Sequence, residues 1–141
     1  MVIAKYIRLS QADEDLKTCG NKSESDSISH QRDLIQKYID DHDDLKGCEL
    51  REFYDDGYSG TNFKRPSFER LLEQIRRGEV DCVIVKDFSR FGRDYIELGD
   101  YLERIFPFLG VRFISVIPKK EIKWKICQKC EIIIDNYAKI C

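Results

Sequence analysis

Short apolar runs alternate with amphipathic stretches along the first 117 residues of the chain. The runs at 2–7, 50–54, 80–85 and 111–117 are rich in β-favouring residues and predict four strands. Between them, apolar residues recur at helical spacing, which predicts helices with the following buried stripes: Ile28, Leu34, Ile35, Tyr38 and Ile39; Phe68, Leu71, Leu72 and Ile75; Leu98, Tyr101, Leu102, Ile105 and Phe106. This alternation predicts an α/β fold, a largely parallel sheet of four to five strands with helices on both faces.

Local signals mark where these helices begin and end. Asp26 or Ser27 suits the N-cap of the first helix, and Pro66 suits the first position of the second. Asp94, with Glu97 three residues later, resembles a capping box for the third helix. The polar stretch 11–26 reads as a loop, and glycines end the three helices at Gly47, Gly78 and Gly110.

Residues 118–141 differ in composition from the rest of the chain. This lysine-rich tail carries Cys127 and Cys130, which have the spacing of half a zinc site, whereas a structural site needs four ligands. Apolar residues alternate with lysines over 122–126, a pattern that is compatible with an added edge strand. Residues 131–140 are compatible with a short helix. We therefore expect one domain over 1–117 and leave 118–141 as an unassigned basic, cysteine-containing tail.

Composition excludes some classes of protein. No apolar run approaches the roughly 20 residues of a membrane span, and the N-terminus lacks a signal-peptide pattern. A cytoplasmic protein without a membrane partner is expected, with its six cysteines reduced and with Cys48 and Cys82 as small core residues. The net charge of -2 argues weakly against nucleic acid, but residues 64–93 lean basic, so a phosphate partner on one face stays possible beside ordinary solvated helix surfaces.

Polar residues gather where the predicted strands end. In such sheets ligands bind outside the carboxyl ends of the strands. Those ends carry, in order, the residues Arg8 and Ser10, then Asp55, Asp56 and Ser59, then Lys86, Arg90 and Arg93. An arginine can bind two phosphate oxygens at once and keeps its charge at any working pH. The convergence therefore favours a phosphate site over an ordinary solvated basic surface.

A serine among arginines suits phosphoryl transfer. The arginines would neutralise the phosphate and stabilise the charge that develops in the transition state, so a metal is not required. The only histidines, His30 and His42, lie in a helical region and do not predict a hydrolase triad. No Walker-type glycine loop occurs, which excludes the usual ATPase site.

Four motifs occur in order along the chain: Tyr6-x-Arg8-x-Ser10, Ser27-Ile28-Ser29-His30-Gln31, Asp56-Gly57-Tyr58-Ser59-Gly60 followed by Arg65-Pro66, and Ser89-Arg90-Phe91-Gly92-Arg93-Asp94. Over residues 1–117 the chain closely resembles the catalytic domain of serine recombinases, the resolvases, invertases and integrases. The form of the last motif looks most like that of the large recombinases of mobile elements.

The resemblance implies site-specific DNA recombination on double-stranded DNA. It implies that Ser10 attacks a phosphodiester and forms a 5′-phosphoserine link, with neither ATP, metal nor cofactor. Family members act as a tetramer of two dimers. The resemblance implies these roles: Arg8, Arg65, Arg90 and Arg93 around the scissile phosphate, Tyr6 and Gln31 lining the site, and Asp56 ordering the arginines or assisting proton transfer. Ser59 and Lys86 join them as supporting candidates because they lie at the same strand ends.

Two departures from the family pattern matter. Ser89 stands where many small resolvases carry an aspartate, so a general-acid role does not transfer to it. Residues 118–141 do not match the long dimerisation helix and DNA-binding domains that follow in the family. We therefore expect a catalytic domain without its DNA-binding domains. The alternative is a truncated, catalytically inactive recombinase fragment that acts only as an interaction module.

Overall fold

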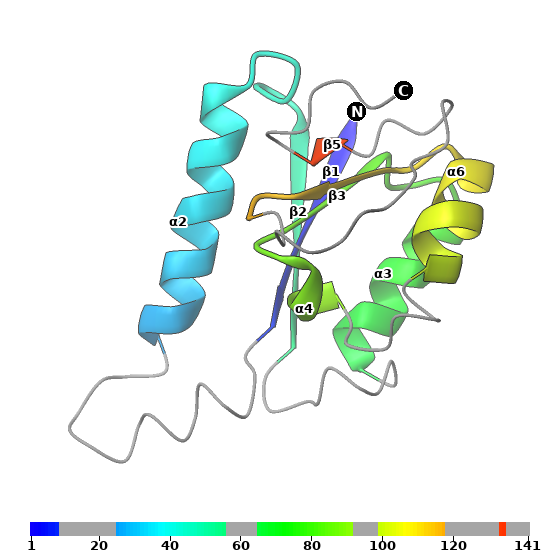
Figure 1. Cartoon of the computed structure of the whole chain (residues 1–141), viewed down its shortest axis with the longest axis horizontal. Helices are drawn as coiled ribbons and strands as arrows, with labels where there is room; N and C mark the ends of the chain where they lie inside the picture. Colours follow the sequence, from blue (N-terminus) through cyan, green and yellow to red (C-terminus); the bar gives the residue numbers. More distant parts are fainter. Residues whose placement is uncertain (9–24, 56–64, 92–98, 118–132, 135–141) are drawn as a thin grey trace.

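The computed structural model describes residues 1–8, 25–55, 65–91, 99–117 and 133–134 (Figure 1). They form a five-stranded sheet with the order β2-β1-β3-β4-β5, in which every neighbouring pair is parallel. The strands are β1 (Val2–Arg8), β2 (Glu49–Asp55), β3 (Cys82–Val85), β4 (Arg112–Ser115) and β5 (Ile133–Ile134). The predicted parallel sheet is confirmed, and its four expected strands are β1 to β4.

Helices cover both faces of this sheet, as predicted. On one face lies the long helix α2 (Ser25–Asp41). The other face carries α3 (Pro66–Arg76), α4 (Phe88–Phe91), the π-helical segment η2 (Tyr101–Ile105) and α6 (Phe106–Leu109). No helix in the described ranges is long and apolar enough to cross a membrane.

Side-chain alternation along β1 divides the core into two layers. Ile3 and Ile7 pack toward α2, whereas Ala4 and Tyr6 pack toward α3 and α6. Successive side chains of a strand point to opposite faces, so Arg8 falls on the Tyr6 side. The predicted stripe of α3 is confirmed because Phe68, Leu71, Leu72 and Ile75 are all buried. Arg8, the last residue of β1, therefore lies on the face of the sheet that α3 covers.

Several local predictions differ from the structure. Helix α2 begins at Ser25, so Asp26 and Ser27 lie within it and are not its N-cap. A four-residue helix, α4, follows β3 and was not among the predicted helices. Ile133–Ile134 pairs with β4 as a strand, which excludes a helix at those two residues. The 11–24 loop, the 122–126 strand, Asp94, Cys127 and Cys130 lie outside the described residues.

Cys82 is expected to react with thiol reagents at least about a hundredfold more slowly than Cys48. Cys82 is fully buried on the α2 side, and burial raises the pKa of its thiol to about 12. Cys48 is half-buried at the edge of the same layer. The measurement is iodoacetamide labelling at pH 8 with mass spectrometry, using urea-unfolded protein as the control. Equal native rates at the two cysteines would contradict the buried position of Cys82.

Candidate functional site

The candidate site lies where the direction of strand order reverses. From β1 the chain first adds β2 on one side, and later places β3 on the other side of β1. In open parallel sheets a crevice forms at the carboxyl ends of two such strands. Arg8 ends β1, and Arg90 lies in α4 directly after β3. The fold therefore brings residues 82 positions apart to one edge of the sheet.

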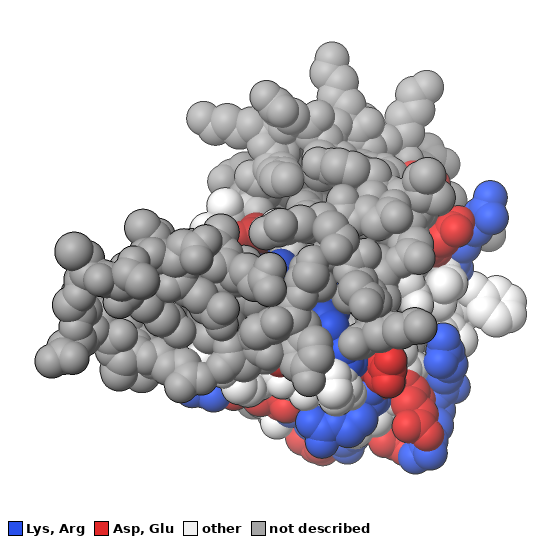
Figure 2. All heavy atoms as spheres, turned by 90° about the horizontal axis from the view of Figure 1, so that it is seen from below, with Lys and Arg blue, Asp and Glu red and all other residues white. Residues whose placement is uncertain are grey.

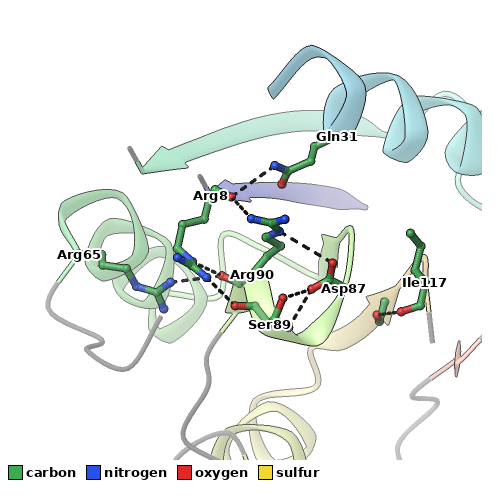
Figure 3. A network of polar contacts seen from close by, with 8 residues as sticks. Arg8, Gln31, Arg65, Asp87, Ser89, Arg90 and Ile117 are labelled. Carbon is green, nitrogen blue, oxygen red and sulfur yellow. Dashed lines mark hydrogen bonds and ion pairs between the residues drawn. The ribbon is translucent and has the colours of Figure 1, made fainter. Parts of the chain in front are cut away.

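Arg8 is a buried arginine that binds backbone carbonyls. Its side chain is 1% exposed. Nε donates to the carbonyl of Arg90 at 3.2 Å, and Nη2 donates to the carbonyl of Ser89 at 2.7 Å (Figure 3). The last carbonyls of a helix lack intrahelical partners, and α4 is only one turn long. Arg8 thus caps α4 and joins it to β1.

Arg65, just before α3, shares the Arg90 carbonyl with Arg8 and also binds the carbonyl of Phe91. Nη1 donates to the carbonyl of Arg90 at 3.2 Å, and Nη2 donates to that of Phe91 at 2.5 Å. Its guanidinium carbon lies 4.3 Å from the ring centroid of Phe68 and 5.4 Å from that of Tyr6. Burial lowers the pKa of Arg65, but a guanidinium keeps its charge in proteins. A buried cation is therefore held between aromatic rings and the end of α4.

Arg90 completes a group that we call the arginine cluster (Arg8, Arg65 and Arg90). Its Nη1 donates to the carbonyl of Arg8 at 3.1 Å, and its Nε lies 3.8 Å from Oδ2 of Asp87. Gln31, fully buried on α2, donates through Nε2 to the same Arg8 carbonyl at 3.3 Å (Figure 3). Its Oε1 has no hydrogen-bond partner within the described ranges. Side chains from α2 and α4 thus converge on the carbonyl at the end of β1.

Asp87 organises the start of α4. Its Oδ1 accepts a hydrogen bond from the backbone N–H of Ser89 at 2.9 Å, and the Ser89 hydroxyl also donates to it. A carboxylate that binds the N–H groups of the first turn is a normal helix N-cap. The hydroxyl of Ser89 is therefore engaged with Asp87.

Asp55, at the end of β2, is one of the polar residues noted at the strand ends, but the sequence pattern assigned it no role. Its carboxylate is 3% exposed and accepts hydrogen bonds from Tyr6 Oη and from the backbone N–H groups of Ser67 and Phe68, each at 3.0 Å. Burial raises the pKa of the Tyr6 phenol well above its ordinary value; the charge of Arg65 opposes the rise and Asp55 adds to it. A usable signal was strand alternation, which puts Asp55 on the same inward face as Phe53.

The predicted site residues separate into three groups. Tyr6, Arg8, Gln31, Arg65 and Arg90 lie close together in the structure. Lys86 follows β3 and is half-buried, but its ammonium group makes no hydrogen bond or ion pair with the described residues. The remaining candidates, Ser10, Asp56, Ser59 and Arg93, lie outside the described residues.

Exposed charges show less organisation than the buried ones. On the described part of the face in Figure 2, Lys and Arg alternate with Asp and Glu over short distances. Ion pairs between exposed or partly exposed side chains include Arg77–Glu73 at the end of α3 and Arg32–Glu52 at 2.5 Å. Among the described residues, no group of three or more His, Cys, Asp or Glu side chains could hold a metal ion. Within the part of the chain that the structure describes, the arginine cluster concentrates positive charge in a buried place.

Comparisons with known proteins identify the family and the fold of this chain. A family model described as "Resolvase, N terminal domain" matches residues 3–124. A resolvase of Clostridium perfringens is 28% identical over 83 residues, which is 59% of this chain but only 39% of that protein. The N-terminal catalytic domain of TP901-1 integrase has a TM-score of 0.63 and 25% identity, with 82% of this chain and 77% of that chain covered. The C-terminal catalytic domain of ISC1926 TnpA, an IS607-like serine recombinase, shares the fold with a TM-score of 0.61 and 22% identity over 85% of this chain and 73% of that chain.

Proposed function

The chain belongs to the serine recombinase family with a resolvase N-terminal catalytic domain, and from this premise we propose that it cleaves and rejoins DNA at specific sites. The observation that carries the proposal is the convergence of Arg8, Arg65 and Arg90 at the carboxyl edge of β1 and β3. Three guanidinium groups in one buried place suit a phosphodiester, which presents negatively charged oxygens. The catalytic domain would span residues 1–117, and DNA targeting would need further domains.

In the proposed reaction Ser10 is the nucleophile. Its hydroxyl oxygen bonds to phosphorus, the bond from phosphorus to the 3′-oxygen breaks, and the 3′-oxygen leaves as a hydroxyl after taking a proton. The product is a 5′-phosphoserine ester. A 3′-hydroxyl of the partner strand then attacks that ester and releases Ser10. One phosphoester bond replaces another in each step, so the exchange needs no ATP and no cofactor.

The arginines would supply the electrostatic stabilisation in this reaction. Arg8, Arg65, Arg90 and Arg93 would offset the charge that builds on the phosphoryl oxygens, as preorganised cations do in phosphoryl transfer. Arg8 is well suited to this task because it ends β1 two residues before Ser10. Tyr6, Gln31, Asp56, Ser59 and Lys86 would support the phosphate or the arginines.

The proposed partners are double-stranded DNA and further copies of this chain. Recombination joins two sites, so a dimer on each site and a tetramer in the synaptic complex are expected. The reaction would take place in the cytoplasm, where the DNA of a mobile element is accessible.

Covalent trapping tests the proposed function. The full chain would be fused to a DNA-binding module of known site and mixed with supercoiled plasmid that carries paired sites. A denaturant-resistant protein–DNA adduct is expected, attached to the 5′ end of the cut strand. Mass spectrometry of the nuclease-trimmed adduct should place the phosphate on the peptide that contains Ser10. Attachment to a 3′ end, attachment to another residue, or no adduct at all would contradict the proposal.

A further inference from the structure

We propose that Asp55 is a positioning residue of the recombinase site, whose carboxylate holds the first turn of α3 and thereby directs Arg65 into the arginine cluster. The inference rests on the proposed function and adds a residue to it. Asp55 contacts neither Arg8 nor the carbonyls of α4 in any described hydrogen bond. Its effect would pass mainly through the backbone that carries Arg65, although the negative charge of Asp55 also acts on the Arg65 guanidinium.

The first turn of α3 lacks an acceptor from its own N-cap side chain. The N-cap position is Arg65, whose backbone is extended and whose side chain makes no capping hydrogen bond. An arginine has no acceptor to offer the first turn, and this one is used on the carbonyls of Arg90 and Phe91. Without another acceptor, the buried N–H groups of the first turn would lack hydrogen-bond partners, which destabilises the helix start.

Asp55, the last residue of β2, supplies these acceptors. Pro66 occupies the first helical position and has no N–H. The next two N–H groups, of Ser67 and Phe68, donate to Oδ1 and Oδ2 of Asp55, and that of Glu69 donates to the carbonyl of Arg65 at 2.8 Å. Every N–H of the first turn is therefore satisfied. The carboxylate therefore accepts the hydrogen bonds that an N-cap side chain normally accepts. The Arg65 side chain can then bind the carbonyls of α4.

The Asp55 carboxylate also connects the first turn of α3 to β1, the strand that ends with Arg8. Tyr6 Oη donates to Asp55 Oδ2, and the register of the sheet pairs Arg8 with Asp55. The ring of Phe68, which follows the capped N–H, is one of the two rings that Arg65 lies over. A shift of the α3 start would move that ring and the Arg65 backbone together. Asp55 thus sets the distance between Arg65 and Arg8.

Hydrogen exchange of the arginine side chains tests the proposal independently of activity. In the full chain, Asp55→Asn keeps the shape of the side chain but offers one acceptor oxygen in place of two. The guanidinium hydrogens of Arg65 should then exchange at least about tenfold faster in NMR spectra, while those of Arg8 stay within about twofold. The matched control is Asp81→Asn, because Asp81 accepts the N–H of Val2 at 2.7 Å at the opposite end of β1. Asp55→Ser serves if Asp55→Asn does not fold.

Activity gives the second readout, in the fused protein. Asp55→Asn should lower the cleavage rate about tenfold to a hundredfold with unchanged affinity for DNA. In an Arg65→Gln background the same change should add less than about twofold, since residues that act through one another are not additive. Unchanged Arg65 exchange, or a full additional loss in that background, would overturn the proposal. If the wild-type fusion forms no adduct, the proposed function fails, and the exchange measurement still decides whether Asp55 positions Arg65.

Discussion

Replacing Ser10 with alanine is expected to abolish the covalent protein–DNA adduct, a loss of at least about a thousandfold in strand cleavage. Ser10 carries the hydroxyl proposed to bond to phosphorus, and it follows by two residues the strand end that holds Arg8. Alanine offers no nucleophile, and the remaining arginines can bind a phosphate without cutting the chain. The adduct is measured on denaturing gels after incubation with plasmid carrying paired sites.

Ser89 provides the matched control for this experiment. It is the described serine whose carbonyl binds Arg8, but its hydroxyl donates to Asp87 and is proposed to take no part in the chemistry. Ser89→Ala keeps the backbone carbonyl and N–H, so the adduct should form at a rate within about fivefold of wild type. If Ser10→Ala still forms the adduct and Ser89→Ala does not, the assigned nucleophile is wrong.

The variant Arg8→Gln is expected to lower strand cleavage by about a hundredfold to a thousandfold and to destabilise the fold by about 2–5 kcal/mol. The first effect follows from removing a preorganised cation from the proposed phosphate site. The second follows because the carbonyls of Ser89 and Arg90 lose donors in a buried place. Urea unfolding measures the stability, and single-turnover cleavage at saturating DNA measures the rate.

Two further arginine variants separate these effects. Arg8→Lys keeps the charge but cannot reach both carbonyls, so it should recover part of the rate and little of the stability. Arg32→Gln removes an exposed arginine that pairs with Glu52, and it should change stability by less than about 1 kcal/mol and leave cleavage unchanged. Equal losses in Arg8→Gln and Arg32→Gln would show that the buried cluster has no special role.

Elements whose stabilising contacts are local in sequence were predicted, and those that depend on contacts with distant segments were not. The α/β fold was predictable because β1, α2, β2 and α3 carry their apolar residues at the period of their own structure. Helix α4 was missed because four residues hold too little periodicity, and the carbonyls at its C-terminal end are bound by Arg8 and Arg65 from distant segments. A one-turn helix cannot be recognised without those partners.

For the site, the sequence alone determined roughly where three arginines of the ordered motifs meet, since Arg8 and Arg90 stand next to strand ends and Arg65 precedes the start of a predicted helix. Only the tertiary structure decided what their side chains bind. Arg8 contacts carbonyls 81 and 82 positions away, and Asp55 caps a helix whose N–H groups lie 12 and 13 positions away. Motif spacing constrains neighbours along the chain, whereas buried polar groups take whichever partners the packed sheet and helices bring within hydrogen-bonding distance.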